Sequence, residues 1–321
     1  MKGDLDKETQ ALVEKLTEKK LRRQDSKSIN LGMQSFLKSI DVLELINRIK
    51  KFRALNFQQL SEEDVFKAII NVLYWEENPI EPVYTAAYPC KTRFFRVRKL
   101  DGNIILDENL KSVSDFWEPP KECVKKPGRL NKEGESLLYV VPGEPHVAIK
   151  EMRMREGEYY ALIEYIAKAS IKVNIIGGNL DYELFGINDE HAIMVHEIIN
   201  NFLRDEFSRD VGEGTEYLYK ISETIAKSLY DLPPREVQDA WAYSSVQDKT
   251  KYNVCFRPEI AHDMLELQGA LICQKGKSED IRVHCVALYE KEENEVKYYE
   301  IGSEKQKKIF PEIITTNVGI K

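Results

Sequence analysis

The chain has 321 residues, of which 42% are hydrophobic and 31% are charged, a composition typical of a folded protein with one large domain or two ordinary ones. Its formal net charge of −7 argues against a general nucleic-acid-binding role, because proteins that coat nucleic acid usually present a basic face. The sequence has no apolar run of about eighteen residues, and its N-terminus is charged. We therefore expect no membrane span, no secretion signal and a cytoplasmic location.

The cysteines predict a reducing compartment. The five of them are widely spaced, and no two form a CxxC pair: Cys90, Cys123, Cys255, Cys273 and Cys285. This usage is typical of thiols that serve as small core residues. Cysteine and histidine pairs with ligand spacing are absent from the sequence, so it predicts no metal site.

The first region, residues 1–85, is predicted to be helical. Residues 5–24 are charged almost throughout, and the basic cluster 19–23 within them is typical of a solvated helix face. Apolar side chains over residues 42–49 recur at the spacing of a packed helix. Ser61, which three acidic residues follow, predicts the N-cap of another helix.

The second region, residues 86–321, mixes short strands with helices. Strands are predicted at 93–98, 137–141, 241–243 and 252–256, with two more inside 158–177 and a hairpin formed by 281–289 and 295–301. Helices are predicted at 192–207 and at about 215–229. The first segment inside 158–177 is compatible with a helix as well as a strand. Because the helices cluster in the middle of the region, we predict an α+β fold with a mixed, largely antiparallel sheet.

Six segments, in this order along the chain, resemble the RES domain, a family named for its arginine, glutamate and serine. They are Arg96 in a strand, residues 128–131 (GRLN), 138–139 (LY), 148–151 (AIKE), 243–245 (YSS) and 253–256 (NVCF). The resemblance covers roughly residues 91–265, and the ordered set carries it, since no single segment is specific. Two positions differ: Leu130 stands where the family often has an aromatic residue, and Ser244 where it often has proline.

The resemblance implies an ADP-ribosyltransferase-like fold that cleaves NAD+ at the nicotinamide–ribose bond, without a metal. Family members act as toxins that deplete NAD+ by phosphorolysis or hydrolysis, and a small antitoxin usually holds them. Transfer of ADP-ribose to a protein is also known for the family. For this chain we therefore expect NAD+ as substrate, phosphate or water as acceptor and an antitoxin as partner, with a homo-oligomer left open.

The residues of the resemblance suit this chemistry. Cleavage passes through an oxocarbenium-like transition state, which an ionised carboxylate stabilises, and Glu151 is the candidate. Arginine binds phosphate oxygens with a planar fork, so Arg96 and Arg129 are predicted to hold the pyrophosphate. Tyr139 is predicted to stack on nicotinamide or bond to the ribose, and Ser245 to anchor the substrate or position the acceptor.

Asn253 is predicted to belong to the residues that bind NAD+ and to orient the loop that carries Ser245. Each residue also has a structural interpretation. Arg96 alone is compatible with a surface charge, and Arg129 with a residue that caps a turn. Tyr139 is compatible with an ordinary core residue. Glu151 is compatible with an acidic residue in the first turn of a helix, and Ser245 with a turn residue.

Two rival functions remain open from the sequence. In the first, the same fold transfers ADP-ribose to a macromolecule. In the second, the helices of residues 1–85 form an interaction module and the rest is a non-catalytic scaffold. Side chains that point apart would favour the scaffold, whereas convergence of the predicted residues on one pocket would favour an enzyme.

Overall fold

The computed structural model describes residues 26–80, 84–100, 110–178, 181–183, 187–231, 238–278 and 280–313. The charged stretch 5–24, with its basic cluster 19–23, lies outside the described residues. Among the helices that are described, none is long and apolar enough to cross a bilayer.

A large sheet dominates the described part of the chain. Ten strands form it, in the order β12-β11-β10-β6-β4-β5-β9-β8-β7-β3, and β1 with β2 forms a separate pair. The strands are β1 (Tyr74–Trp75), β2 (Asn78–Pro79), β3 (Tyr84–Tyr88), β4 (Arg93–Lys99), β5 (Leu138–Pro142), β6 (Tyr159–Ala167), β7 (Ile171–Ile176), β8 (Ala240–Ser244), β9 (Tyr252–Phe256), β10 (Leu265–Lys275), β11 (Ile281–Glu290) and β12 (Glu295–Glu300). Within the large sheet only β7 and β8 pair in parallel, so the predicted mixed, largely antiparallel α+β architecture is confirmed.

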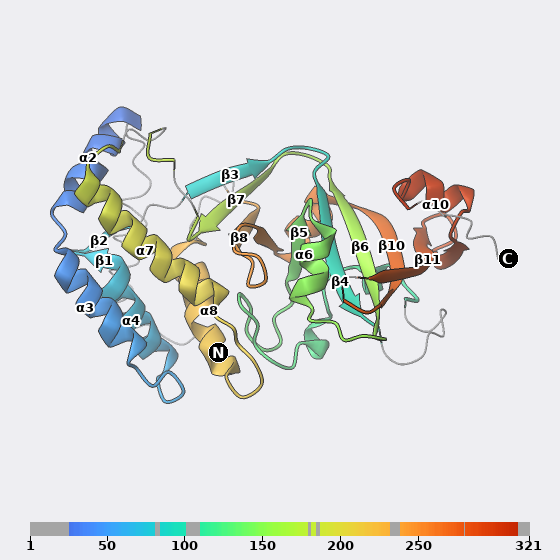
Figure 1. Ribbon diagram of the computed structural model, residues 1–321, viewed down its shortest axis with the longest axis horizontal. Helices are drawn as coiled ribbons and strands as arrows, with labels where there is room; N and C mark the ends of the chain where they lie inside the picture. Colours follow the sequence, from blue (N-terminus) through green and yellow to red (C-terminus); the bar gives the residue numbers. More distant parts are fainter. Residues whose placement is uncertain are drawn as a thin grey trace.

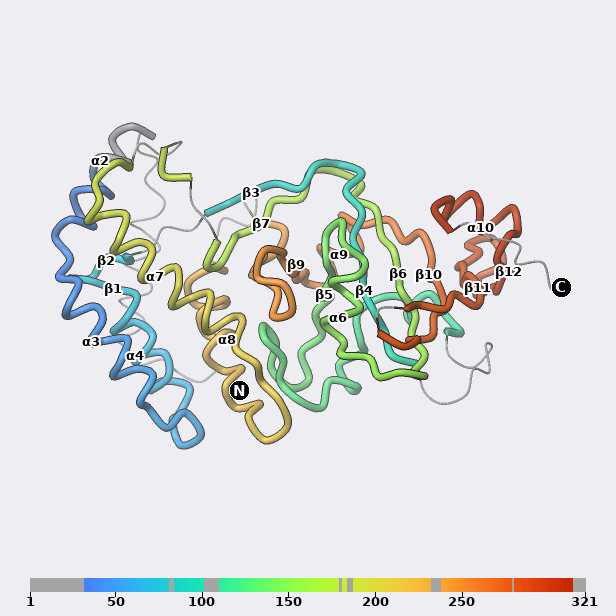
Figure 2. The backbone as a smooth tube through the Cα atoms, in the orientation of Figure 1, coloured from blue at the N-terminus to red at the C-terminus, as the bar shows by residue number. Residues whose placement is uncertain are grey.

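The helices gather mainly at one end of the molecule. They are α2 (Ser26–Lys38), α3 (Val42–Arg53), α4 (Glu62–Leu73), α6 (Pro145–Glu151), α7 (Glu190–Ser208), α8 (Tyr219–Leu229), α9 (Pro258–Met264) and α10 (Glu304–Ile309), with short 3-10 turns η1 (Val113–Phe116), η2 (Lys121–Cys123) and η3 (Glu216–Leu218). Figure 1 shows α2, α3, α4, α7 and α8 on the left, and α10 at the opposite end. The tube in Figure 2 shows α6 running beside β4 and β5.

The predicted helices of the N-terminal region are confirmed as α3 and α4. Ser61 caps α4 as expected: its side chain accepts from the Asp64 backbone N–H, while the Asp64 carboxylate accepts from the Ser61 N–H. Apolar side chains of these helices share one core with α7, α8 and the sheet residues Trp241 and Cys255. Residue 85, the predicted boundary between the two regions, lies within β3.

The segment that the sequence left ambiguous, β6, is a strand. It lies between β4 and β10 in the middle of the sheet, and almost all of its side chains are buried. A strand covered on both faces is apolar along its whole length, so its pattern resembles that of a buried helix. The predicted hairpin of β11 and β12 is confirmed, although α10 follows it.

The expectation of core cysteines holds for three of the five. Cys255, Cys273 and Cys285 are buried, whereas Cys90 and Cys123 are exposed. Cys90 lies in the turn before β4, and Cys123 ends η2.

Candidate functional site

The large sheet splits between β4 and β5. These neighbours pair only at Phe94 with Pro142 and at Phe95 with Val141, whereas β4 pairs with β6 along its whole length. A cavity of about 710 Å³ opens where the two strands separate, and both strands contribute to its walls. A cavity of this size is large enough for a substantial small molecule.

Four of the six predicted site residues line this cavity. Arg96 reaches it from β4, Tyr139 from β5, Glu151 from the end of α6 and Asn253 from β9. Ser245 lies directly behind Glu151 without lining the cavity. The structure thus brings together residues that are far apart in the sequence.

The Glu151 carboxylate is held through one of its two oxygens. Its Oε1 accepts from the Ser245 hydroxyl, from the Val246 backbone N–H at 3.0 Å and from Asn253 Nδ2 at 3.0 Å. Within the described residues, no hydrogen bond reaches Oε2. The three donors fix the plane of the carboxylate and leave the second oxygen for a ligand, because an ionised carboxylate is an acceptor at both oxygens.

The interpretation of Glu151 as a first-turn helix acid is wrong, because it is the last residue of α6. The helix begins at Pro145 and buries Val147, Ala148 and Ile149 against β4 and β5, which places its C-terminal end at the cavity. The partial negative charge of a helix C-terminus disfavours a carboxylate. Here the three donors to Oε1 offset that cost, as charge-assisted hydrogen bonds do.

Ser245 is completely buried, and its hydroxyl is fully used. It donates to Glu151 and accepts from the backbone N–H groups of Gln247 and Asp248, each at 3.1 Å. Its own N–H donates to the Lys251 carbonyl across the β8–β9 turn. Ser245 is therefore both a turn residue and a group that orients Glu151, and its hydroxyl has no open side from which to contact a substrate.

Tyr139 lines the cavity, while its hydroxyl forms hydrogen bonds with the GRLN loop. The hydroxyl accepts from the Leu130 N–H at 2.9 Å and donates to Asn131 Oδ1 at 2.8 Å. Burial raises the pKa of Tyr139 well above its usual value. Of the two predicted roles, stacking remains compatible with this arrangement, whereas hydrogen bonding to a ribose would require the hydroxyl to break its present contacts.

Arg96 has unused hydrogen-bonding capacity. Its Nη1 is buried and has no hydrogen-bond partner among the described residues. Burial lowers the pKa of the guanidinium, an effect that the nearby Tyr165 opposes. A buried, unsatisfied donor is costly, and an anionic ligand in the cavity would satisfy it.

Arg129 is not among the residues that line the cavity. Its Nη2 donates to the Arg209 carbonyl at 3.0 Å, and its guanidinium lies over the Tyr219 ring, 5.4 Å from the centroid. The structure therefore separates Arg129 from Arg96, although the two were predicted to act together. Within the described residues, Arg129 Nη1 is also buried without a partner.

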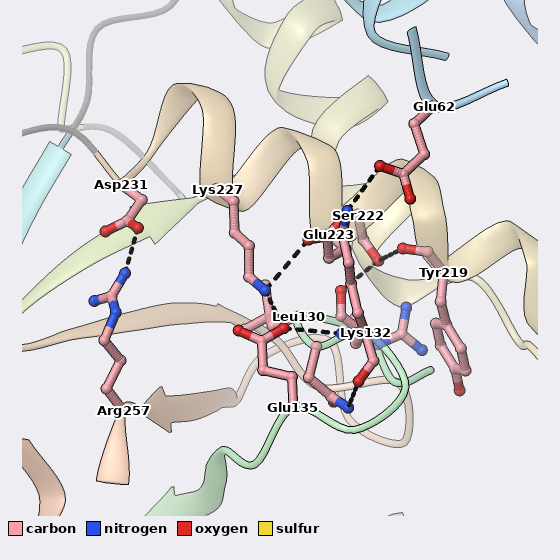
Figure 3. A network of polar contacts seen from close by, with 12 residues as sticks. Glu62, Leu130, Lys132, Glu135, Tyr219, Ser222, Glu223, Lys227, Asp231 and Arg257 are labelled. Atoms are coloured by element: carbon pink, nitrogen blue, oxygen red, sulfur yellow. Dashed lines mark hydrogen bonds and ion pairs between the residues drawn. The ribbon is translucent and has the colours of Figure 1, made fainter. Parts of the chain in front are cut away.

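The loop between η2 and β5 is fixed by a network of charges (Figure 3). Lys132 pairs with Glu62 of α4 at 2.7 Å, and Lys227 of α8 pairs with Glu135. The Ser222 hydroxyl donates to the Arg129 carbonyl at 2.7 Å. These contacts join the GRLN segment to the helical end of the molecule, and so hold Asn131, which also lines the cavity.

Basic side chains that the sequence reasoning missed line the cavity beyond Arg96. Arg98 pairs with Asp115 at 2.9 Å, Lys99 with Glu158 at 2.5 Å and Lys126 with Glu216 at 2.7 Å. Lys125 also lines the cavity and has no ion pair within the described part of the chain. Arg98 could have been predicted from the sequence. Side chains alternate along a strand, so Arg98, two residues after Arg96, lies on the same face.

Tyr243 was also missed. It lies on β8, two residues before Ser245, and lines the cavity with only 3% of its surface exposed. The YSS segment by which Ser245 was predicted also contains this tyrosine. The sequence therefore offered Tyr243 as a candidate, but it could not show that its side chain faces the cavity.

Comparisons with known proteins identify no relative of this chain: no protein-family model, no curated protein and no solved structure matches it.

Proposed function

We propose that the chain cleaves NAD+ at the nicotinamide–ribose bond, as a member of the RES family with an ADP-ribosyltransferase-like fold. The observation that carries the proposal is the convergence of Arg96, Tyr139, Glu151 and Asn253 on one cavity at the split of the sheet. Those residues come from four different elements, so their meeting is a property of the fold and not of sequence proximity.

The geometry supports a different role for each of three side chains in the cavity. Glu151 Oε2 faces the positive charge that develops on the ribose as the C1′–N bond breaks and its electron pair stays with nicotinamide. Arg96 binds the pyrophosphate through its unsatisfied Nη1, and the Tyr139 ring stacks on nicotinamide. An oxygen of water or inorganic phosphate then bonds to C1′, and the acceptor gives up its proton to solvent.

The rival scaffold interpretation predicted side chains that point apart, and the shared cavity does not favour it. Transfer of ADP-ribose to a macromolecule uses the same first step, so one assay separates the remaining outcomes. In a cell that makes the protein, cleavage would deplete NAD+, which is the basis for proposing a toxin-like effect.

The test is incubation of the purified protein with NAD+ labelled in the ADP-ribose part, with and without inorganic phosphate. We expect release of nicotinamide, together with ADP-ribose from hydrolysis or ADP-ribose 1-phosphate from phosphorolysis. Label on protein or nucleic acid would identify transfer instead. Absence of nicotinamide release under all of these conditions would overturn the proposal.

A second test reports binding without turnover. Cys123 is exposed and lines the cavity, whereas Cys90 is exposed but does not line it. Bound NAD+ should therefore slow maleimide labelling of Cys123 and leave labelling of Cys90 unchanged. Equal rates at Cys123 with and without saturating NAD+ would contradict binding in this cavity.

A further inference from the structure

Two tyrosines of the cavity differ in what their hydroxyls do. The Tyr139 hydroxyl has both a donor and an acceptor from the protein, at Leu130 and Asn131. The Tyr243 hydroxyl makes no hydrogen bond within the described residues. The residue as a whole is almost completely buried, but its hydroxyl is not one of the buried polar atoms that lack a partner, so it is accessible from the cavity that Tyr243 lines. A phenol in such a place normally finds a partner. The open side of the cavity is where a partner would be.

The register of the sheet places Tyr243 beside the carboxylate. Tyr243 pairs directly with Asn253, so the two side chains share one face of β8 and β9. Asn253 in turn donates to Glu151 Oε1 at 3.0 Å. The ring of Tyr243 packs behind this group against Phe207, with 5.8 Å between centroids. Its position is therefore set by the sheet and by α7, which pre-organises the hydroxyl.

The surroundings keep this hydroxyl protonated. Burial raises the pKa of Tyr243 far above its usual value. Arg129 opposes that rise, and Glu151 adds to it. At neutral pH the phenol is thus a neutral group that can donate one hydrogen bond and accept another.

We infer that Tyr243 is a specificity-determining residue that binds the ribose of the substrate together with Glu151. A carboxylate oxygen and a phenol hydroxyl that line the same cavity suit a vicinal diol, in which one hydroxyl donates to Glu151 Oε2 and the other bonds to Tyr243. This inference rests on the proposed function and assigns the substrate class as a nucleotide with an intact ribose diol at the bond that breaks.

The test is Tyr243→Phe, assayed with NAD+ and with two analogues that lack the 2′- or the 3′-hydroxyl of the nicotinamide ribose. With NAD+ we expect kcat/KM to fall on the order of tenfold, the effect of one net hydrogen bond. One of the two analogues lacks the ribose hydroxyl that bonds to Tyr243. With that analogue, wild type and variant should react at the same rate. An equal loss with all three substrates, or no loss with NAD+, would overturn the inference.

Stability supplies a separate readout. Since the hydroxyl makes no hydrogen bond within the described residues, Tyr243→Phe should melt within about 2 °C of the wild type, as near-neutral substitutions do. A variant that melts far lower or does not fold would show that the protein itself holds the hydroxyl, which also overturns the inference. Tyr160→Phe is the matched control, because that buried hydroxyl likewise lacks a partner in the described part but lies outside the cavity lining. It should leave all rates unchanged.

The two proposals fail differently. If the wild-type protein releases no nicotinamide, both fall. If it releases nicotinamide but Tyr243→Phe matches it with every substrate, cleavage stands and only the role of Tyr243 falls.

Discussion

Glu151 is the side chain around which the candidate site is built. Three donors from the β8–β9 region converge on its Oε1, and the α6 C-terminus carries it to the cavity. Ser245 was predicted to contact the substrate or its acceptor, and Asn253 to bind NAD+ and orient the loop that carries Ser245. In the structure both donate a hydrogen bond to the Glu151 carboxylate. A substitution at either residue would thus act through the orientation of Glu151.

Replacement of Glu151 by glutamine isolates the charge. The amide oxygen of Glu151→Gln can accept from the same three donors, so we expect the fold to survive. The negative charge at the second oxygen is lost, and nicotinamide release should fall by at least ~100-fold, a typical cost for one preorganised electrostatic group.

Glu144→Gln is the control for this variant. Glu144 directly precedes the same helix without a side-chain capping hydrogen bond, pairs with Lys251 at 2.7 Å and does not line the cavity. It should leave the rate near that of the wild type. Wild-type activity in Glu151→Gln would remove Glu151 from the mechanism.

At the scale of the elements, local sequence signals predicted most helices and strands. Ser61 and the three acidic residues after it predicted the start of α4. The helical spacing of apolar residues predicted α3, α7 and α8. The longest strand, β10, was missed. Its pairing with β6 shifts register between Leu267 and Gly269, and such an irregularity breaks the alternation by which strands are predicted. Gly269 suits this position because its φ of +148° is one that other residues rarely adopt, and because a Cβ would lie 3.0 Å from the Ala287 carbonyl oxygen.

The N-cap of α4 should contribute measurably to stability. Ser61→Ala removes the side-chain acceptor of the Asp64 N–H, so we expect a loss of about 1 kcal/mol in the free energy of unfolding. Urea denaturation measures it. Ser35→Ala, an exposed position within α2, should cost nothing, since alanine favours a helix. Equal stability of Ser61→Ala and wild type would contradict the capping argument.

At the scale of the whole molecule, the helical end and the sheet are joined by shared apolar packing and by buried polar contacts. His196 of α7 is completely buried, and its two ring nitrogens contact the hydroxyls of Tyr84 on β3 and Tyr182, each at 2.9 Å. Burial lowers the pKa of His196 to about 4. The folded protein therefore holds this histidine neutral at pH values where the unfolded chain protonates it.

This difference predicts a loss of stability in mild acid. The unfolded chain binds the proton as the pH falls below about 6.5, whereas the folded chain does so only near pH 4. Stability should thus be fully present above about pH 7 and fall by roughly 3 kcal/mol toward pH 4 through this residue. Urea midpoints at pH 7.5 and pH 5 measure the effect, and His196→Gln should show a smaller difference. The same difference in both proteins would exclude His196 as its source.

The sequence by itself determined the local features of this protein: the capped helices, the strands around the GRLN segment, the α+β class, and the residues that resemble a RES site. These follow from periodicity, capping and turn chemistry, all of which act between near neighbours. Only the tertiary structure decided which of those residues meet. In the folded chain, the cavity at the split between β4 and β5 is lined by Arg96, Tyr139, Glu151 and Asn253. Arg129 does not line this cavity and instead donates to the Arg209 carbonyl. The tertiary structure also added Tyr243, because strand pairing sets which side chains share a face, and no local pattern encodes that register.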